Sequence, residues 1–438
     1  MADSDLRVGL CGLGTVGSGV VNLFNTHGGL IRERCGAGLQ LTHIGARRDN
    51  PDCDLSHYRV SRDIFDVVRD PEVDVVVELI GGTSIAKQLV EEALEQGKHV
   101  VTANKALIAE YGNALAAQAE AKGLALRFEA AVAGGIPVIK TLREALAANA
   151  VSGIVGIING TGNFILTEMA SAGRPFADVL AEAQSLGYAE ADPTFDVDGT
   201  DAAHKLVILA SLAFGVPLDT SGPFTEGIDR VQPEDLEFAR ELGFCIKHLG
   251  IARRRVDGLD LRVHPALVPA SRQIARVDGV LNAVMIEADA VGEIVLTGPG
   301  AGSLPTASAV CGDLVDLGRI LSTAASDPVP ILGVTTGALV PQPVVPAEDV
   351  TCAWYLRLVV ADRPGVMAEI TRLLGDSGIS IESLIQRPPV ANSSHVTVVM
   401  LTDVVTGGQI QSAVSNIEAL PALQGEVTCL RVESFEGA

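Results

Sequence analysis

The sequence has 438 residues, of which 47% are hydrophobic, enough apolar material for two or three packed cores. Its formal net charge of -22, without a cluster of Lys and Arg, argues against nucleic acid and anionic membranes as partners. Seven cysteines without CxxC pairs, an acidic N-terminus and no apolar run of the ~18 residues that span a membrane predict a soluble cytoplasmic protein.

The N-terminal third alternates short apolar runs with helix-like segments, which is the pattern of a parallel sheet with crossover helices. The runs are 8–11, 41–46, 73–79, 99–102 and 124–130. We therefore predict a Rossmann-type, doubly wound α/β domain over residues 1–136.

The alternation ends near Pro137, and an α+β domain is predicted for residues 137–302. We expect helices at 177–186, 201–214 and 233–251, and strands at 153–158 and 294–297.

Residues 326–350 hold five prolines and little periodicity, which predicts an extended linker. A last domain is predicted for 351–438, because its patterns read strand, helix, strand, strand, helix, strand between 354 and 433. This is the ferredoxin-like order.

The first chemical motif is GLGTVG, which follows the first predicted strand. Gly12 would form the tight turn, Gly14 would let a pyrophosphate approach the backbone, and Gly17 would allow close packing of helix on strand. Thr15 and Val16, at the start of the helix, would also contact the cofactor. A glycine-rich turn without a ligand is the alternative, but its place in the first of several alternating units favours dinucleotide binding.

The end of the second predicted strand indicates which dinucleotide is bound. Arg47 and Arg48 stand where an NAD site usually offers an acidic residue to the ribose, and two guanidinium groups suit a 2′-phosphate. NADP is therefore favoured over NAD. In the alternative interpretation both arginines are solvated and Asp49 binds the ribose.

Residues 190–205 read EADPTFDVDGTDAAHK, five carboxylates followed by a lysine. Aligned on Gly199, a calcium loop would end at Lys205, a cation where a glutamate is required, so that type of site is excluded. The helix after Asp201 is apolar nearly all round and should be buried. A salt bridge between Asp201 and Lys205 at the surface is the alternative, but a lysine on a buried helix needs a partner or a function.

A desolvated lysine near a second cation can be neutral close to pH 7 and accept a proton from a hydroxyl. Lys105, in Thr-Ala-Asn-Lys after the fourth predicted strand, could supply that cation at the sheet edge where ligands bind. Glu190, Asp196 and Asp201 would then accept hydrogen bonds from a substrate ammonium group.

Six segments together resemble homoserine dehydrogenases, in the same order across residues 1 to about 325. They are GLGTVG, TANK, EAAVAGGIP (129–137), NGTGNFIL (159–166), GYAEADPTFDVDGTDAAHK (187–205) and GPGAG (298–302). The family interconverts L-homoserine and L-aspartate 4-semialdehyde with NAD(P), on the branch toward threonine, methionine and isoleucine.

The resemblance implies specific roles for these residues. Lys205 would be the acid/base lysine, and Lys105 would contact both cofactor and substrate. Glu190 would bind the substrate amino group, with Asp196 and Asp201 completing the site in a substrate-binding and dimerisation domain.

The resemblance also implies a monovalent cation, sodium or potassium, held by the Glu129 side chain and the carbonyls of Val132, Gly134 and Ile136. Oxygen ligands suit such an ion. By the same analogy the chain returns to the cofactor domain after the GPGAG loop, over about 303–325, with Gly302 close to the nicotinamide.

The motif DRPGV after the strand at 354–361 looks like the opening of an ACT domain. Such domains usually pair through their sheets and bind amino acids, so threonine is the expected effector and a homodimer or homotetramer the expected assembly. A purely structural dimerisation domain is the alternative.

Two rival functions are less consistent with the sequence. A cysteine-dependent aldehyde dehydrogenase needs a cysteine with a histidine base, but Cys11 lies inside the glycine turn and Cys311 follows the GPGAG loop without a nearby histidine. A non-catalytic amino-acid sensor would have no use for Lys105, Lys205 and Glu190.

Overall fold

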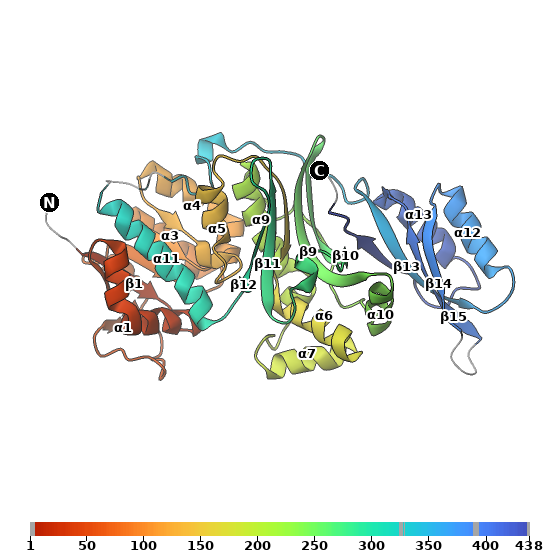
Figure 1. Cartoon of the computed structure of the whole chain (residues 1–438). Coiled ribbons are helices and arrows are strands. Elements are labelled where there is room, and N and C mark those ends of the chain that lie inside the picture. The colour runs from red at the N-terminus through yellow and green to blue at the C-terminus, as the bar shows by residue number, and fades with distance from the viewer. Residues whose placement is uncertain (1–4, 324–326, 328, 389–393, 436–438) are drawn as a thin grey trace. The chain divides into compact units, whose positions relative to one another are not determined.

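The computed structural model describes residues 5–323, 327, 329–388 and 394–435. The chain forms two compact units (Figure 1). The first comprises Met1–Ile154, Ala202–Gly222 and Leu281–Gln342, and the second comprises Val155–Asp201, Pro223–Val280 and Pro343–Ala438.

A six-stranded parallel sheet forms the centre of the first unit, with the strand order β3-β2-β1-β4-β5-β6. Its strands are β1 (Leu6–Cys11), β2 (Leu39–Gly45), β3 (Arg59–Ser61), β4 (Val75–Glu78), β5 (His99–Thr102) and β6 (Leu126–Arg127). The predicted doubly wound α/β fold is confirmed. The sequence did not reveal β3, because its three residues contain no apolar run.

Helices follow the strands, and a late helix returns to the same core. They are α1 (Thr15–Cys35), α2 (Phe65–Arg69), α3 (Ser84–Glu95), α4 (Lys105–Ala121) and α11 (Ser303–Leu321). Ala307, Val310 and Leu314 of α11 lie in one buried cluster with strand residues of β1 and β2. α11 packs so closely on α1 that a Cβ at Gly19 would lie 2.6 Å from the Ser303 carbonyl oxygen.

The remaining elements of the first unit follow the sheet or form a hairpin. They are η1 (Glu129–Ala131), α5 (Val138–Lys140), η2 (Thr141–Ala145), β11 (Leu281–Ala288), β12 (Gly292–Pro299) and η4 (Thr336–Ala338). β11 and β12 pair antiparallel. Two elements cross between the units, β7 (Val151–Ile157) and α9 (Thr200–Phe214).

The second unit begins with helices that carry the acidic segment, followed by a long antiparallel hairpin. Its elements up to residue 280 are α6 (Gly160–Ala172), α7 (Phe176–Ser185), α8 (Thr194–Val197), β8 (Phe224–Thr225), α10 (Pro233–Glu241), β9 (Phe244–Arg255), β10 (Gly258–Pro269) and η3 (Ile274–Arg276).

The helix predicted at 233–251 is wrong in its second half. α10 ends at Glu241, Gly243 has a left-handed φ of 85°, and β9 starts at Phe244. Residues 246–252 of β9 are buried on both faces, so they lack the alternation that marks a strand.

The C-terminal part of the second unit has the predicted order of strands and helices. It contains β13 (Thr351–Ala361), α12 (Val366–Asp376), β14 (Ile381–Gln386), β15 (His395–Thr402), β16 (Val405–Thr406), α13 (Gly407–Glu418) and β17 (Thr428–Val432). Its sheet runs β17-β13-β15-β14. β17 also pairs in parallel with β10, so this sheet continues into the β9-β10 hairpin.

The proline-rich segment lies against each unit in turn. In the first unit the Glu120 carboxylate accepts hydrogen bonds from the backbone N–H and the hydroxyl of Thr336, at 3.0 and 2.6 Å. In the second unit Leu259 exchanges backbone hydrogen bonds with Pro343 and Val345. The described part of the segment contains η4 as well as turns, and it is hydrogen-bonded at Thr336 and again at residues 343 and 345.

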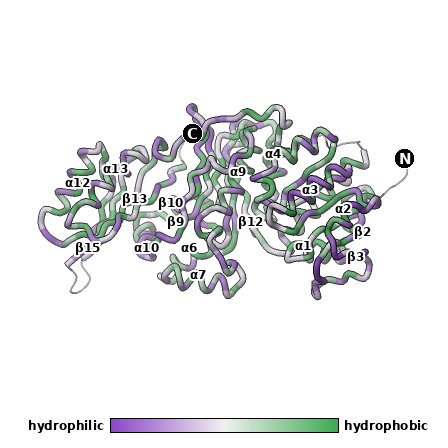
Figure 2. The backbone as a smooth tube through the Cα atoms, turned by 180° about the vertical axis from the view of Figure 1, so that it is seen from behind, coloured by the Kyte–Doolittle hydropathy of each residue, from purple (hydrophilic) through white to green (hydrophobic). Residues whose placement is uncertain are grey.

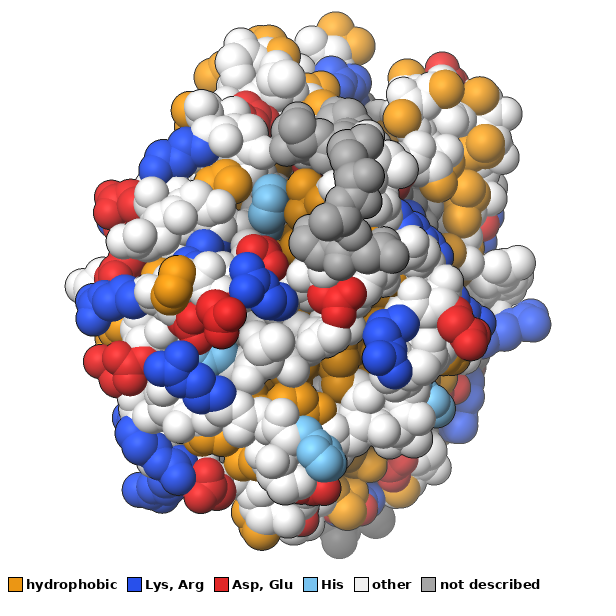
Figure 3. Space-filling view, turned by 90° about the vertical axis from the view of Figure 1, so that its left-hand side faces the viewer, with side chains coloured by type: hydrophobic (Ala, Val, Ile, Leu, Met, Phe, Trp, Pro, Cys, Tyr) orange, Lys and Arg blue, Asp and Glu red, His pale blue; other side chains and the backbone are white. Residues whose placement is uncertain are grey.

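The charges on the surface and the hydropathy of the helices are those of a globular protein. On the face shown in Figure 3, basic and acidic side chains are intermingled. Hydrophilic and hydrophobic residues alternate along the helices in Figure 2, and within the described part of the chain no helix is long and apolar enough to cross a membrane.

Candidate active site

The glycine-rich turn has the geometry that its three glycines predict. Gly12 has a φ of 103°, and a Cβ there would lie 2.5 Å from the Leu79 carbonyl oxygen. A Cβ at Gly17 would lie 2.1 Å from the Gly12 carbonyl oxygen. Gly14, by contrast, precedes α1 with open space in front of it. The turn is therefore tightly packed on the protein side and open where a pyrophosphate would approach.

Thr15 and Val16 open α1 beside this turn, Thr15 exposed and Val16 half-buried. The Thr15 carbonyl accepts a hydrogen bond from the Ser303 hydroxyl at 2.7 Å. Gly302, with a φ of 118°, immediately precedes α11. The loop before α11 is thus fastened to the start of α1, and Gly302 lies exposed near the glycine-rich turn.

Arg47 and Arg48 follow β2 and are both exposed. Asp49 is engaged by Arg62, whose guanidinium nitrogens lie 2.9 and 3.0 Å from its two carboxylate oxygens. This pairing lowers the pKa of the Asp49 carboxyl, so the group stays ionised and occupied. The alternative role of Asp49 as the ribose acceptor would require it to leave Arg62. Sequence reasoning did not identify Arg62, since it lies beyond β3.

Lys105 is the first residue of α4 and is half-buried. Asn104 caps the helix, because its side-chain oxygen accepts a hydrogen bond from the Leu107 N–H at 3.1 Å. α4 starts directly after β5, at the carboxyl edge of the parallel sheet. Lys105 therefore lies at the edge where open α/β sheets bind ligands.

Glu129 is buried and holds the backbone around it. Its two carboxylate oxygens accept hydrogen bonds from the N–H groups of Ile139 and Lys140, at 2.9 and 2.7 Å. Its own N–H donates to Asp313 at 2.8 Å. Burial, and then the Asp313 charge, raise the pKa of Glu129 to about 7. Two buried carboxyl groups therefore lie close together, and a cation would stabilise their charged forms.

The predicted carbonyl ligands lie in the loop after Glu129. Val132, Gly134 and Ile136 are all buried, and both Ala133 and Gly134 have left-handed φ values, of 55° and 49°. The loop packs on the GPGAG segment, because the Gly135 N–H donates to the Pro299 carbonyl at 3.0 Å. The donor set of one carboxylate and several carbonyls fits a hard monovalent cation.

In the second unit, one asparagine connects two of the predicted substrate carboxylates. The Asn159 side-chain nitrogen donates to Asp196 at 2.8 Å and to Asp201 at 2.9 Å. Its oxygen caps α6 by accepting the Gly162 N–H at 2.7 Å. Asp201 is buried and Asp196 half-buried. The structure therefore brings these two carboxylates together, and sequence reasoning missed Asn159 because it lies about 40 residues before them.

Glu190 is exposed in the loop after α7. Two contacts fix this loop: the Thr161 hydroxyl donates to the Tyr188 carbonyl at 2.7 Å, and the Gln184 side chain donates to the Glu190 carbonyl at 3.1 Å. The Tyr188 ring also stacks edge-on against Phe164 at 5.1 Å. The Glu190 carboxylate is thus exposed on an ordered backbone.

Lys205 lies one helical turn after Asp201 on α9, so both residues occupy the same face of that helix. α9 is otherwise apolar, and Leu206, Ile208 and Leu209 are fully buried. Lys205 itself is half-buried. The predicted buried helix at 201–214 is confirmed, and its lysine remains partly accessible.

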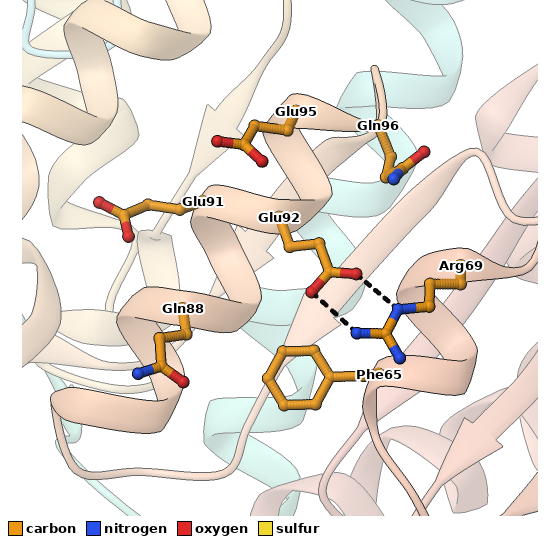
Figure 4. A pocket seen from close by; sticks show the side chains of 7 residues that line it. All are labelled: Phe65, Arg69, Gln88, Glu91, Glu92, Glu95 and Gln96. Atoms are coloured by element: carbon orange, nitrogen blue, oxygen red, sulfur yellow. Dashed lines mark hydrogen bonds and ion pairs between the residues drawn. The ribbon is translucent and has the colours of Figure 1, made fainter.

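The structure also has a surface hollow between α2 and α3. It is lined by Phe65, Arg69, Gln88, Glu91, Glu92, Glu95 and Gln96 (Figure 4). Arg69 is bound to Glu92 through two hydrogen bonds of 2.7 and 3.3 Å. None of the predicted site residues lines this hollow, so we do not assign it to the active site.

Three family models match the chain. The model described as homoserine dehydrogenase, NAD binding domain, matches residues 12–129, the homoserine dehydrogenase model matches 137–315, and the ACT domain model matches 354–422. The three matches cover the glycine-rich turn, the acidic segment with α9, and the C-terminal sheet with its helices.

Characterised relatives agree over the whole chain. The homoserine dehydrogenase of Pseudomonas aeruginosa is 52% identical over 98% of this chain and 99% of its own length, and that of Neisseria gonorrhoeae is 46% identical with the same coverage. The crystal structure of a homoserine dehydrogenase from Thiobacillus denitrificans superposes with a TM-score of 0.92, at 49% identity over 98% of both chains. The chain belongs to the homoserine dehydrogenase family, whose members are oxidoreductases.

Proposed function

We propose that the protein interconverts L-homoserine and L-aspartate 4-semialdehyde and prefers NADP as its cofactor. The observation that carries this proposal is the arrangement on α9, where Asp201 and Lys205 share one face of an otherwise apolar helix. Lys205 is half-buried, and the Asp201 carboxylate on the same helix face accepts a hydrogen bond from Asn159. A lysine in this setting suits proton transfer beside a bound ammonium group.

In the proposed reaction a bound NADP would supply the acceptor for the hydride that leaves the hydroxyl-bearing carbon. Lys205 takes the hydroxyl proton as the carbonyl forms and returns it in the reverse direction, so homoserine and NADP⁺ give the semialdehyde, NADPH and one proton. Lys105 contacts cofactor and substrate from the start of α4. Glu190, Asp196 and Asp201 accept hydrogen bonds from the substrate ammonium group.

The proposed cofactor site follows the glycine-rich turn. Gly12, Gly14, Thr15, Val16 and Gly17 would hold the pyrophosphate and the adjoining ribose, and Gly302 would approach the nicotinamide. Arg47 and Arg48 would bind the 2′-phosphate. Their exposure, and the engagement of Asp49 by Arg62, support NADP, and NAD is the alternative cofactor. A hyperthermophilic archaeal homoserine dehydrogenase, 26% identical, has been solved in complex with NADPH.

We further propose a sodium or potassium ion at Glu129 and the carbonyls of Val132, Gly134 and Ile136. Support comes from the raised pKa of Glu129, caused first by burial and then by Asp313, because a bound cation would offset both effects. The ion would hold together the loop that packs on the GPGAG segment.

For the C-terminal domain we propose regulation by threonine and a role in a homodimer or homotetramer. The domain boundaries that we propose are 1–136 with a return at 303–325 for the cofactor domain, 137–302 for the substrate and dimerisation domain, 326–350 for the linker and 351–438 for the ACT domain. Roles in threonine, methionine and isoleucine biosynthesis follow from the proposed reaction. The cytoplasmic location stays a prediction.

The proposed function is tested by following NADPH absorbance when the purified full-length chain is given L-homoserine and NADP⁺. We expect formation of NADPH that depends on homoserine, and the reverse reaction with the semialdehyde. A chain that binds threonine and NADPH but turns over neither substrate would instead be the amino-acid sensor considered above.

A further inference from the structure

Glu78 is a buried carboxylate that none of the proposed steps uses. It ends β4 and is fully inaccessible to solvent. One carboxylate oxygen accepts the N–H groups of Ile80 and Gly81, at 2.9 and 3.3 Å, and the other accepts the Thr102 hydroxyl at 2.5 Å. Glu78 therefore joins the ends of two neighbouring strands, β4 and β5.

A chain of hydrogen bonds leads from Glu78 to the start of α4. The Thr102 hydroxyl oxygen accepts the Asn104 N–H at 3.0 Å. The Asn104 side chain caps α4 and also donates to the Gly82 carbonyl at 2.6 Å. Lys105 is the next residue. Thr102 and Asn104, which this chain of hydrogen bonds orients, therefore fix the backbone that leads into Lys105.

Burial raises the pKa of the Glu78 carboxyl, so its charged form is costly. An apolar residue would avoid this cost but would leave the N–H groups of Ile80 and Gly81 and the Thr102 hydroxyl without this acceptor. The cost is understandable if the carboxylate fixes two loops at the ligand-binding edge of the sheet.

We infer that Glu78 is a positioning residue that sets the orientation of Lys105 and of the Gly81-Gly82 turn beside the cofactor. The inference rests on the proposed role of Lys105. Glu78 acts through Thr102 and Asn104, and it touches neither substrate nor cofactor.

The test is a double-mutant cycle between Glu78→Gln and Lys105→Ala, read as kcat/KM for homoserine. A misplaced catalytic group can cost about 100-fold in rate, so we expect a loss of that order for Glu78→Gln and little further loss when it is added to Lys105→Ala. Thr102→Val, which removes the connecting hydroxyl but keeps the shape, should reproduce the loss if Glu78→Gln folds poorly.

Asp70→Asn is the matched control. Asp70 is also a buried carboxylate of the first unit, paired with His43 at 2.8 Å and Arg59 at 3.0 Å, and it precedes β4. Its loss should lower the melting temperature and leave kcat/KM of the folded enzyme unchanged. Full additivity of Glu78→Gln and Lys105→Ala would overturn the inference. Wild-type activity of Lys105→Ala alone would instead refute the role proposed for Lys105.

A separate observation concerns the contacts between Arg431 of the C-terminal domain and the segment 224–228. Arg431 of β17 is buried between two rings, with its guanidinium carbon 4.7 Å from the ring centroids of both Trp354 and Phe224. One guanidinium nitrogen lies 3.2 Å from the Glu226 carboxylate. Through Arg431, the ACT-like domain thus contacts the segment 224–228, which lies outside that domain.

At its other end, this segment contacts the acidic residues 190–205 through Gly227 and Ile228. The Ile228 N–H donates to the Val197 carbonyl at 3.0 Å. A Cβ at Gly227 would lie 2.6 Å from the same carbonyl oxygen and 3.0 Å from the Asp198 Cα. Val197 directly follows Asp196. Residues 224–228 therefore connect Arg431 to helix α8, which carries the proposed substrate ligand Asp196.

We propose that residues 224–228 are the route by which an amino acid bound to the C-terminal domain changes homoserine binding. The proposal rests on the regulation proposed above. A two-state shift at Arg431 would move the segment against Val197, and couplings of this kind are typically about 1–3 kcal/mol, or 5–150-fold in affinity.

The experiment compares threonine binding with threonine inhibition in the full-length chain. Arg431→Met keeps an unbranched apolar chain and removes the guanidinium with its charge; the variant should still bind threonine in calorimetry, with inhibition weakened at least fivefold. Gly227→Ala, which crowds the other contact, should also change inhibition. Arg372→Met, a control on α12 whose partner Asp376 is exposed, should change neither. Normal inhibition in both test variants would overturn the route, and a wild-type chain that does not bind threonine would refute the regulation itself.

Discussion

Acidic side chains in the two units differ in their burial and in their hydrogen-bond partners. In the first unit, Glu78 and Glu129 are buried and accept backbone N–H groups, so they shape the loops around them. In the second unit, Asp196 and Asp201 share one asparagine side chain, and Glu190 is exposed. The first set therefore fixes backbone, whereas for the second set we propose contact with a substrate ammonium group.

The largest expected effect comes from the lysine to which we assign the proton transfer, Lys205. Positioned acid/base groups contribute about 10² to 10⁴ in rate, so Lys205→Ala should lose at least about 10² in kcat. NADPH binding, measured by fluorescence titration, should be spared. A variant that keeps more than about a tenth of the wild-type kcat would show that another group moves the proton.

The next effect concerns cofactor choice in the first unit. Replacing Arg47 and Arg48 with glutamine removes charge-assisted hydrogen bonds of about 1.5 to 3 kcal/mol each before any discount for exposure, so KM for NADP should rise at least about tenfold. KM for NAD should barely move. Arg69→Gln, which only loses its pairing with Glu92, is the control. Equal changes with both cofactors would place the two arginines away from the 2′-phosphate.

A comparable effect is expected when the exposed carboxylate of Glu190 is neutralised. Glu190→Gln should raise KM for homoserine about tenfold or more, because a charge-assisted hydrogen bond to the ammonium is lost. The affinity for NADP, followed by calorimetry, should stay the same. If cofactor binding falls instead, Glu190 belongs to the cofactor site.

The smallest expected effect is on stability, through the buried carboxyl at Glu129. Its pKa is raised to about 7, mainly by burial, so the folded state binds more protons than the unfolded state between about pH 4.5 and 7. The melting temperature should therefore fall as pH rises through this range, and Glu129→Gln should lessen the fall.

Sodium or potassium should raise the melting temperature of the wild type above pH 7, when Glu129 is ionised, and should do so less in Glu129→Gln. A choline salt at the same ionic strength is the control. An identical cation response in the two proteins would argue against a cation at this loop.

How much the sequence revealed depends on the range of the contacts. The glycine-rich turn and the start of α4 are local, so a few adjacent residues were enough to predict them. The partnership of Asn159 with Asp196 and Asp201 spans 37 and 42 residues, and no local pattern encodes it. Glu78 was missed for a similar reason, because its role depends on the neighbouring strand.

The contacts of the C-terminal domain also change how its role should be tested. Asp235 of α10, fully buried, binds the Tyr355 hydroxyl at 3.0 Å and the Arg357 guanidinium at 2.5 and 3.1 Å. The proline-rich linker predicted at 326–350 is a second possible path of coupling, and removal of the domain after about residue 325 would test it. Because truncation would remove the Tyr355 and Arg357 partners of the buried Asp235 and expose apolar surface, point variants at Arg431 are the cleaner test.

The central claim is that the second unit recognises the substrate ammonium group while Lys205 moves the proton. The most direct measurement is the ratio of kcat/KM for L-homoserine to that for 4-hydroxybutanoate, which has the same hydroxyl and no amino group. We predict that the wild type strongly favours homoserine and that Glu190→Gln lowers this ratio about tenfold or more, mainly by losing activity toward homoserine. Equal use of both compounds by the wild type, or an unchanged ratio in the variant, would contradict the account.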